Sequence, residues 1–206
     1  DSEDEIANSA TQVGDVRPGD IKFRDLNSDG VIDAYDQAPL GYGSIPEIVY
    51  GFGTTLSWKG FSVGAFFQGI GNVDILLNGE GLVPFEQGGN RGNLLSVITN
   101  RWTPENPSQD VFYPRLTFGE ENHNYRTSSW WVRNGRYLRL KTVELGYNFP
   151  TGWGQRIGVK NARVFALGYN VLTFSPFKLW DVELGDGRGA TYPNISSYNL
   201  GVEFKF

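Results

Sequence analysis

The stretch Tyr198-Asn199-Leu200-Gly201-Val202-Glu203-Phe204-Lys205-Phe206 is the clearest strand pattern in this sequence. Side chains of a strand point alternately to its two faces, so the Tyr, Leu, Val and both Phe residues share one face, and Asn, Gly, Glu and Lys share the other. One apolar and one polar face are typical of a barrel wall between lipid and water. The edge strand of a soluble sheet also alternates, so this stretch alone leaves both folds open.

Four further segments alternate in the same way: residues 48–58, 61–69, 136–149 and 162–172. Lys59-Gly60 separates the first two, which predicts a hairpin with a tight turn. These segments are longer than the five or six residues usual for strands of globular proteins. The sequence therefore predicts an all-β fold with about five antiparallel strands.

Two of these segments need a closer description because their faces are not uniform. The alternation predicts these apolar faces: Val143, Leu145, Tyr147 and Phe149 in 136–149, and Phe165, Leu167, Tyr169 and Val171 in 162–172. Arg139 and Lys141 fall on the apolar parity of residues 136–149 and break the pattern. Such a break is expected only if the start of that strand projects beyond the hydrocarbon.

The connections between the segments alternate in length. Lys59-Gly60 is short and the link 150–161 is modest, whereas about 70–135 and 173–197 are long. Large transmembrane barrels have short turns on the periplasmic side and long loops outside. We therefore predict that residues 48–206 are part of the wall of a transmembrane β-barrel; that they are the C-terminal part of a large barrel is implied by the resemblance described below. Its long loops, and residues 1–47, are expected to be extracellular.

Composition excludes several classes of protein. The chain lacks cysteine, which removes disulfides and thiolate sites, and its net charge of -5 without a basic run argues against nucleic acid. It has no apolar run of about 18 residues, as a membrane helix would need. Gly 27 and aromatic 15% suit a β-structure. Because the chain lacks Met and begins with Asp1, we expect a processed chain or a fragment.

Residues 25–36 form the sharpest local motif. Oxygen-bearing side chains recur at the spacing of a calcium loop: Asp25, Asn27, Asp29, Asp33 and Asp36. Gly30 stands where such a loop bends, and the carbonyl of Val31 would be a further ligand. We predict a structural Ca²⁺ that holds a loop in shape. The alternative is an Asx-rich turn without metal.

No set of residues in the sequence converges on catalysis. His123 is the only histidine, no cysteine accompanies it, and no nucleophile-elbow motif is present, so we predict that the protein is not an enzyme. Trp102, Trp130 and Trp131 lie in the longest loop. They are candidates for stacking on a sugar or packing on a partner, and the alternative is loop packing or an interfacial aromatic belt.

Several stretches occur in one order along the chain: residues 18–33, 50–53, 67–69, 101–107, 137–150, 169–173 and the final strand. The most specific, residues 137–150, reads YLRLKTVELGYNFP. Together they resemble the carboxy-terminal part of SusC/RagA-type TonB-dependent outer-membrane transporters, over nearly everything after about Pro18.

The resemblance implies an importer of bulky nutrients, such as oligosaccharides or peptides, in the outer membrane of a Gram-negative bacterium. It also implies a SusD-like surface lipoprotein as partner and energy from TonB through a plug domain that this chain lacks. Five strands cannot close a wall of about 22, so they would pair with the remainder of the barrel, possibly a separate cleaved chain, and face outer-membrane lipid.

One rival interpretation remains open from the sequence. A secreted, calcium-stapled β-sandwich that binds glycans would also show alternating strands. The barrel segment alone should need detergent to stay in solution, whereas the β-sandwich should be monomeric in buffer.

Overall fold

The computed structural model describes residues 2–79, 81–85, 92, 94–118 and 123–206. The chain divides into two compact units. The loop unit comprises Asp1–Gly41, Leu76–Arg133 and Asp186–Thr191, and the sheet unit comprises Tyr42–Ile75, Asn134–Gly185 and Tyr192–Phe206. Each unit is described by itself below.

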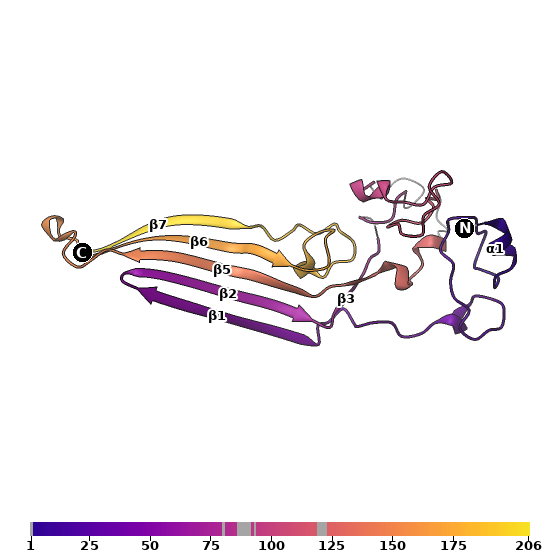
Figure 1. Ribbon diagram of the computed structural model, residues 1–206, viewed down its shortest axis with the longest axis horizontal. Helices are drawn as coiled ribbons and strands as arrows, with labels where there is room; N and C mark the ends of the chain where they lie inside the picture. Colours follow the sequence, from indigo (N-terminus) through magenta and orange to yellow (C-terminus); the bar gives the residue numbers. More distant parts are fainter. Residues whose placement is uncertain (1, 80, 86–91, 93, 119–122) are drawn as a thin grey trace. The chain divides into compact units, whose positions relative to one another are not determined.

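Five long strands make up the main sheet: β1 (Ile48–Trp58), β2 (Phe61–Gly71), β5 (Tyr137–Asn148), β6 (Asn161–Phe174) and β7 (Ser197–Lys205). They pair antiparallel in the order β1-β2-β5-β6-β7, as Figure 1 shows. The five predicted strands are therefore confirmed, with bounds that differ by up to two residues. Two short strands, β3 (Asp74–Leu76) and β4 (Val132–Asn134), form a separate pair.

Helical structure is sparse. The described helices are α1 (Glu3–Ala7) and the 3-10 turns η1 (Ala34–Asp36), η3 (Ser96–Thr99), η4 (His123–Tyr125), η5 (Ser129–Trp131), η6 (Gln155–Ile157) and η7 (Val182–Leu184). None of the helices among the described residues has the length and apolar character needed to cross a membrane.

One face of the sheet carries no charge. Residues paired across neighbouring strands point to the same side, so the register defines this apolar face. It consists of Ile48, Tyr50, Phe52, Thr54, Leu56 and Trp58 of β1; Phe61, Val63, Ala65, Phe67, Gly69 and Gly71 of β2; Leu138, Leu140, Val143, Leu145 and Tyr147 of β5; Ala162, Val164, Ala166, Gly168, Leu172 and Phe174 of β6; and Tyr198, Leu200, Val202 and Phe204 of β7. Its large side chains are widely exposed, with Leu200 at 88%. A β-sandwich would need a second sheet over this face, and the other sheet among the described residues is the β3–β4 pair, whose strands have three residues each.

The opposite, polar face carries the charges of the ladder. It consists of Val49, Gly51, Gly53, Thr55 and Ser57 of β1; Ser62, Gly64, Phe66, Gln68 and Ile70 of β2; Tyr137, Arg139, Thr142, Glu144, Gly146 and Asn148 of β5; Asn161, Arg163, Phe165, Leu167, Tyr169 and Thr173 of β6; and Ser197, Asn199, Gly201, Glu203 and Lys205 of β7. All charged residues of the five strands except Lys141 are in this set. The sheet therefore has one apolar and one polar face, as the alternation predicts.

The predicted face of β6 is wrong for three residues. Leu167 pairs with Glu144 on one side and Asn199 on the other, so Phe165, Leu167 and Tyr169 belong to the polar face. The ring of Phe165 covers Gly201, where a Cβ would come within 2.4 Å of it. Both parities of β6 carry apolar residues, and between Ala162 and Tyr169 the larger ones face the polar side. The register with β5 and β7 decides the matter, since their apolar residues pair with Val164 and Ala166.

The apparent break at Arg139 and Lys141 has a local cause. Phe66 pairs with Thr142 and Phe67 pairs with Leu140, so Lys141 is an extra residue in β5. Such a β-bulge reverses the facing of the residues beyond it. Arg139 therefore lies on the polar face and Leu140 on the apolar face. The expectation that the start of this strand breaks the pattern is wrong, because the bulge restores it.

The loop unit buries its own aromatic residues. Trp131 is 1% exposed and stacks on Tyr125, with ring centroids 5.2 Å apart, while the Tyr113 hydroxyl donates to the carbonyl of Leu82 at 2.8 Å. Burial raises the pKa of Tyr113 to about 12. Asn124 is fully buried beside them; it accepts from the Ile21 amide at 2.8 Å and donates to Asp20 at 2.7 Å.

Candidate functional site: a charged network on the polar face

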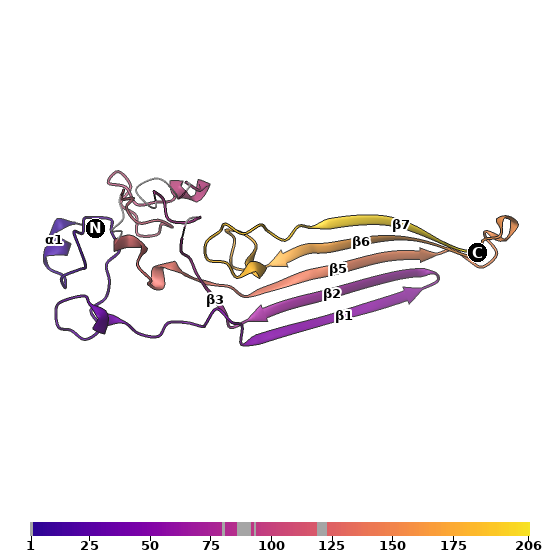
Figure 2. The same ribbon diagram turned by 180° about the vertical axis from the view of Figure 1, so that it is seen from behind.

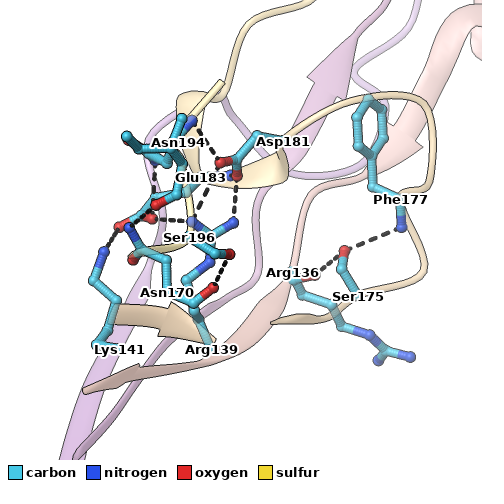
Figure 3. A network of polar contacts seen from close by, with 11 residues as sticks. Arg136, Arg139, Lys141, Asn170, Ser175, Phe177, Asp181, Glu183, Asn194 and Ser196 are labelled. Atoms are coloured by element: carbon cyan, nitrogen blue, oxygen red, sulfur yellow. Dashed lines mark hydrogen bonds and ion pairs between the residues drawn. The ribbon is translucent and has the colours of Figure 1, made fainter. Parts of the chain in front are cut away.

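Arg139 is the centre of a network in the sheet unit, drawn in Figure 3. Its side chain is 4% exposed. The guanidinium donates to Glu183 Oε2 at 2.7 Å and to Asp181 Oδ2 at 3.2 Å, and its second amino group donates to Asp181 Oδ1. Two carboxylates thus share one buried cation that projects from the polar face of β5.

Lys141, the extra residue of the bulge, completes the charge balance. Its Nζ donates to Glu183 Oε1 at 2.7 Å, on the carboxylate that also binds Arg139. The network therefore has two cations and two anions. Buried charges need partners of this kind, because an unpaired charge away from water is very costly.

The two carboxylates come from the connection between β6 and β7. Asp181 caps η7 by accepting from the Glu183 amide at 3.0 Å, and it also accepts from the Asn194 amide at 3.0 Å. The Asn194 side chain donates to Glu183 Oε2 at 3.1 Å. Both arms of the connection are therefore attached to the same charged centre.

Further hydrogen bonds hold the two ends of this connection, next to β6 and β7. Asn170, in the left-handed region with a φ of 51°, donates to the carbonyl of Ile195 at 3.0 Å. Its own carbonyl accepts from Ser196 Oγ at 2.7 Å, and Ser175 Oγ donates to the carbonyl of Arg136 at 2.7 Å. We call residues 175–185 and 192–196 the latched loop, since the network fixes them to the polar face.

The pKa of Asp181 reflects two opposing effects. Burial alone would raise it, but the hydrogen bond from Arg139 and those from the amides of Glu183 and Asn194 favour the ionised form, and the pKa falls below its ordinary value. Asp181 is thus held as a carboxylate. The arrangement can position a loop.

The calcium-type motif folds into a loop of Asx turns. Asp25 accepts from the amides of Ser28 at 2.6 Å and Gly30 at 2.9 Å, and Asp36 accepts from the amides of Leu26 at 2.7 Å and Asp33 at 2.8 Å. The Asp33 and Leu26 amides lower the pKa of Asp36.

The side chains of Asn27, Asp29 and Asp33 also turn toward the backbone two residues ahead. Among the described residues, no three acidic or histidine side chains gather closely enough to hold a metal ion. Each carboxylate oxygen keeps a further lone pair for a cation. Calcium binding by this motif and the Val31 carbonyl stays a prediction.

The three candidate tryptophans have different environments. Trp102 is buried over Gly19, and Trp131 is buried with its Nε1 donating to the Asn124 carbonyl at 2.7 Å. Trp130 is half-buried and donates to the Phe112 carbonyl at 3.1 Å. The buried pair packs inside the loop unit, and only the ring of Trp130 is accessible enough to touch a sugar or a partner.

Relatives of this chain are found among TonB-dependent receptors. No protein-family model matches it. Receptors P26 and P3 of Formosa agariphila are 34% and 31% identical, over 91% and 96% of the chain and 20% of each receptor. TonB-dependent receptor SusC of Bacteroides thetaiotaomicron is 24% identical over 92% of the chain and 18% of SusC.

Solved structures agree with this relationship. The RagAB peptide transporter superposes with a TM-score of 0.64 at 26% identity, over 86% of this chain and 19% of that one. RagAB in its "closed-closed" state gives a TM-score of 0.67. Over most of its length the chain is similar to TonB-dependent receptors, SusC among them. It spans about a fifth of the length of the receptors that it matches.

The likeness to these receptors explains the exposed apolar face. The sheet is a stretch of a transmembrane β-barrel wall, as the resemblance predicted. Sequence reasoning missed the network around Arg139, although two signals were available: Arg139 and Lys141 break the alternation of a strand, and Asp181-x-Glu183 supplies two anions in the following loop.

Proposed function

We propose that this chain forms part of the wall of an outer-membrane transporter that imports bulky nutrients, oligosaccharides or peptides, into a Gram-negative bacterium. The apolar face carries the proposal. It is exposed, uncharged and continuous across five strands, and burying apolar surface gains about 25 cal/mol per Å². Hydrocarbon is the surrounding that such a face requires.

The names of the relatives support the remaining parts of the proposal. TonB-dependent receptors are named for their dependence on TonB, and RagAB is described as a peptide importer. A SusD-like lipoprotein is the partner that the family resemblance implies. We expect energy from TonB to reach the barrel through a plug domain in the rest of the receptor.

The two edge strands of the sheet, β1 and β7, need partner strands from the rest of the barrel. Among the described strands, β1 pairs only with β2, and β7 pairs only with β6. An unpaired strand edge is not tolerated in lipid, because its amide and carbonyl groups would lack partners. Both edges would therefore pair with other strands of the receptor, in the same or a separate polypeptide.

The latched loop gives the polar face a role in the solute path. The polar face of such a wall lines the lumen, so a loop fixed to it by Arg139 narrows the passage. The proposal therefore assigns the network a positioning role, and Trp130 of the loop unit is a candidate contact for the solute or the lipoprotein.

The transport proposal is tested with the whole receptor in its native strain. Uptake of fluorescent oligosaccharides and peptides would be compared in the parent strain, a receptor deletion and a strain without TonB. We expect uptake of one solute class to be lost in both mutants and restored by the receptor gene. Equal uptake in all strains, or a receptor found in the soluble fraction, would contradict the proposal.

Calcium in the loop of residues 25–36 is a separate proposal, with a structural role. Terbium luminescence and calorimetry on the whole receptor would compare the native loop with Asp29→Ala, and Asp15→Ala would be the control outside the motif. We expect saturable binding that Asp29→Ala weakens and Asp15→Ala leaves unchanged. Equal binding by all three proteins would leave the loop as a set of Asx turns.

A further inference from the structure

The end of the sheet at the β1–β2 turn has a charge of its own. We call residues 58–61, 147–163 and 203–206 the turn end; Figures 1 and 2 show these segments together at one end of the sheet. The turn end holds five of the 18 Lys and Arg residues and one of the 23 Asp and Glu residues. Its net charge is therefore +4, and the rest of the chain carries -9.

Backbone hydrogen bonds join the three segments of the turn end. The Asn148 amide donates to the Gly60 carbonyl at 2.8 Å, and the Lys160 amide donates to the Lys205 carbonyl at 2.8 Å. Within the link between β5 and β6, the Val159 amide donates to the Gly154 carbonyl at 3.0 Å. The charged residues of the turn end therefore lie on segments that are hydrogen-bonded to one another.

Exposed aromatic rings lie in the same segments as these charges. Trp58 ends the apolar face of β1 and is 69% exposed, and Trp153 is 60% exposed and stacks on Phe149 with centroids 4.7 Å apart. Phe61 and Tyr147 pair beside Trp58 on the apolar face. Trp and Tyr concentrate where hydrocarbon meets headgroups, so this end of the face has the composition of a membrane interface.

Four of the five cations of the turn end are exposed. Lys205 is one of them but lies on the polar face, so the candidates are the three cations of the turn and of the β5–β6 link: Lys59, Arg156 and Lys160. Arg163 does not count among them, because it lies on the polar face and pairs with Glu144. Lys59 is held with a φ of 45° in the turn, a conformation in which Asn or Gly would be less strained. Its Nζ lies 4.9 Å from the Trp58 ring centroid. A lysine kept at a position of strained backbone, beside an exposed tryptophan, indicates that its charge is functional.

We infer that the turn end binds the phosphate headgroups of anionic phospholipids. The inference rests on the proposed function, since it needs the apolar face to lie in hydrocarbon. Acyl chains would then lie along Phe61 and Tyr147, while Lys59, Arg156 and Lys160 donate to phosphate oxygens just beyond the rings. The predominance of positive charge makes an anionic lipid the favoured occupant over a zwitterionic one.

The experiment uses the whole receptor, purified from its own membrane in mild detergent. Retained phospholipids would be quantified by class in wild type, in the triple variant Lys59→Gln/Arg156→Gln/Lys160→Gln and in a control triple variant Arg24→Gln/Arg126→Gln/Lys178→Gln. The control removes three exposed charges outside the turn end. We expect wild type and control to be enriched in anionic lipid. In the turn-end variant this enrichment should fall about fivefold for each charge removed.

Other outcomes separate this inference from the transport proposal. Equal anionic enrichment in all three proteins, or an equal loss in both variants, would overturn the lipid site while leaving the barrel intact. The lipid site would also be overturned if an acidic protein co-purified with wild type and was lost from the turn-end variant, while the retained lipids were the same in both. Wild-type receptor that retains no lipid of any class would contradict the membrane location itself.

Lys59→Asn provides a second measurement. Because Asn tolerates the left-handed conformation, this variant should keep or raise the melting temperature of the receptor while lowering anionic lipid retention. A purely structural role for Lys59 would leave lipid retention unchanged.

Discussion

The loop unit and the sheet unit treat the same kinds of side chain in opposite ways. In the loop unit, Trp131 and Tyr113 are buried against other aromatic rings. In the sheet unit, Trp58 and Leu200 lie on a face that the described chain leaves open. One region builds its own core, and the other leaves its apolar surface for something else to cover. The comparison indicates two different solvents, water for the loop unit and hydrocarbon for the sheet.

Polar side chains are arranged differently in the two regions as well. The loop unit holds its segments together with a neutral amide, Asn124, and an ion pair between Asp20 and Arg115 at 2.9 Å. The sheet unit holds its loop with a buried charge network around Arg139. Breaking these two arrangements should therefore have different costs.

The largest effect is expected at Arg139. Arg139→Ala would leave Asp181 and Glu183 buried with too little positive charge, which destabilises closure of the latched loop by about 3–5 kcal/mol. Hydrogen exchange of residues 181–184 in the whole receptor measures this opening. Arg136→Ala, which removes an exposed guanidinium near the same loop, serves as the control and should leave exchange unchanged. Equal protection in both variants would mean that the network does not hold the loop.

A charge on the apolar face should have the next largest effect. Leu145→Arg places a cation among Val63 and Ala166, where lipid is expected, at a cost of about 2–4 kcal/mol. Thr55→Arg, on the polar face in the adjacent row, should cost little. Unfolding of the refolded receptor in phospholipid vesicles compares the two. A similar loss in both variants would remove the distinction between the faces.

A smaller effect is expected in the loop unit. Asn124→Ala removes the acceptor of the Ile21 amide and a donor to Asp20, and leaving buried polar groups unsatisfied costs about 1–3 kcal/mol. Local protease resistance of residues 10–24 would report the change, with the exposed Asn106→Ala as control. Unaltered resistance would show that the amide does not hold this segment.

Acid should weaken the latched loop least. The folded pKa of Asp181 lies below its ordinary value of 3.8, so its contribution to stability is complete above that pH and is lost as the pH falls through the folded pKa. A fluorophore at Tyr192→Cys would follow loop release from pH 7 downward. We expect a constant signal to about pH 4 and release below it, and Asp181→Asn should reduce this pH dependence. A transition near pH 6 would point to another group.

Much of the sheet could be predicted from the sequence because alternation is a local property. The strands around Leu145 and Leu200 show it clearly, and the turn at Lys59-Gly60 fixes the hairpin of β1 and β2. Tyr198, Val202 and Phe204 lie on the face that the pattern predicts. The resemblance of residues 137–150 to SusC-type transporters added the barrel, which five strands alone do not specify.

The remaining features depend on contacts between distant residues. The facing of Phe165 depends on which β5 and β7 residues it opposes, and the bulge at Lys141 depends on the register with β2. The link from Arg139 to Asp181 spans 42 positions. Alternation within one segment contains none of this information, which explains the error in β6 and the missed network.

Two adjacent residues, Val164 and Phe165, give the most direct test of the apolar face. Each would be replaced by Cys in a cysteine-free whole receptor, labelled with bimane and reconstituted in vesicles with brominated acyl chains. The register requires strong quenching at Val164→Cys and weak quenching at Phe165→Cys. Strong quenching at Phe165→Cys and weak quenching at Val164→Cys would contradict this assignment of the face. Equal weak quenching at both would contradict the membrane wall.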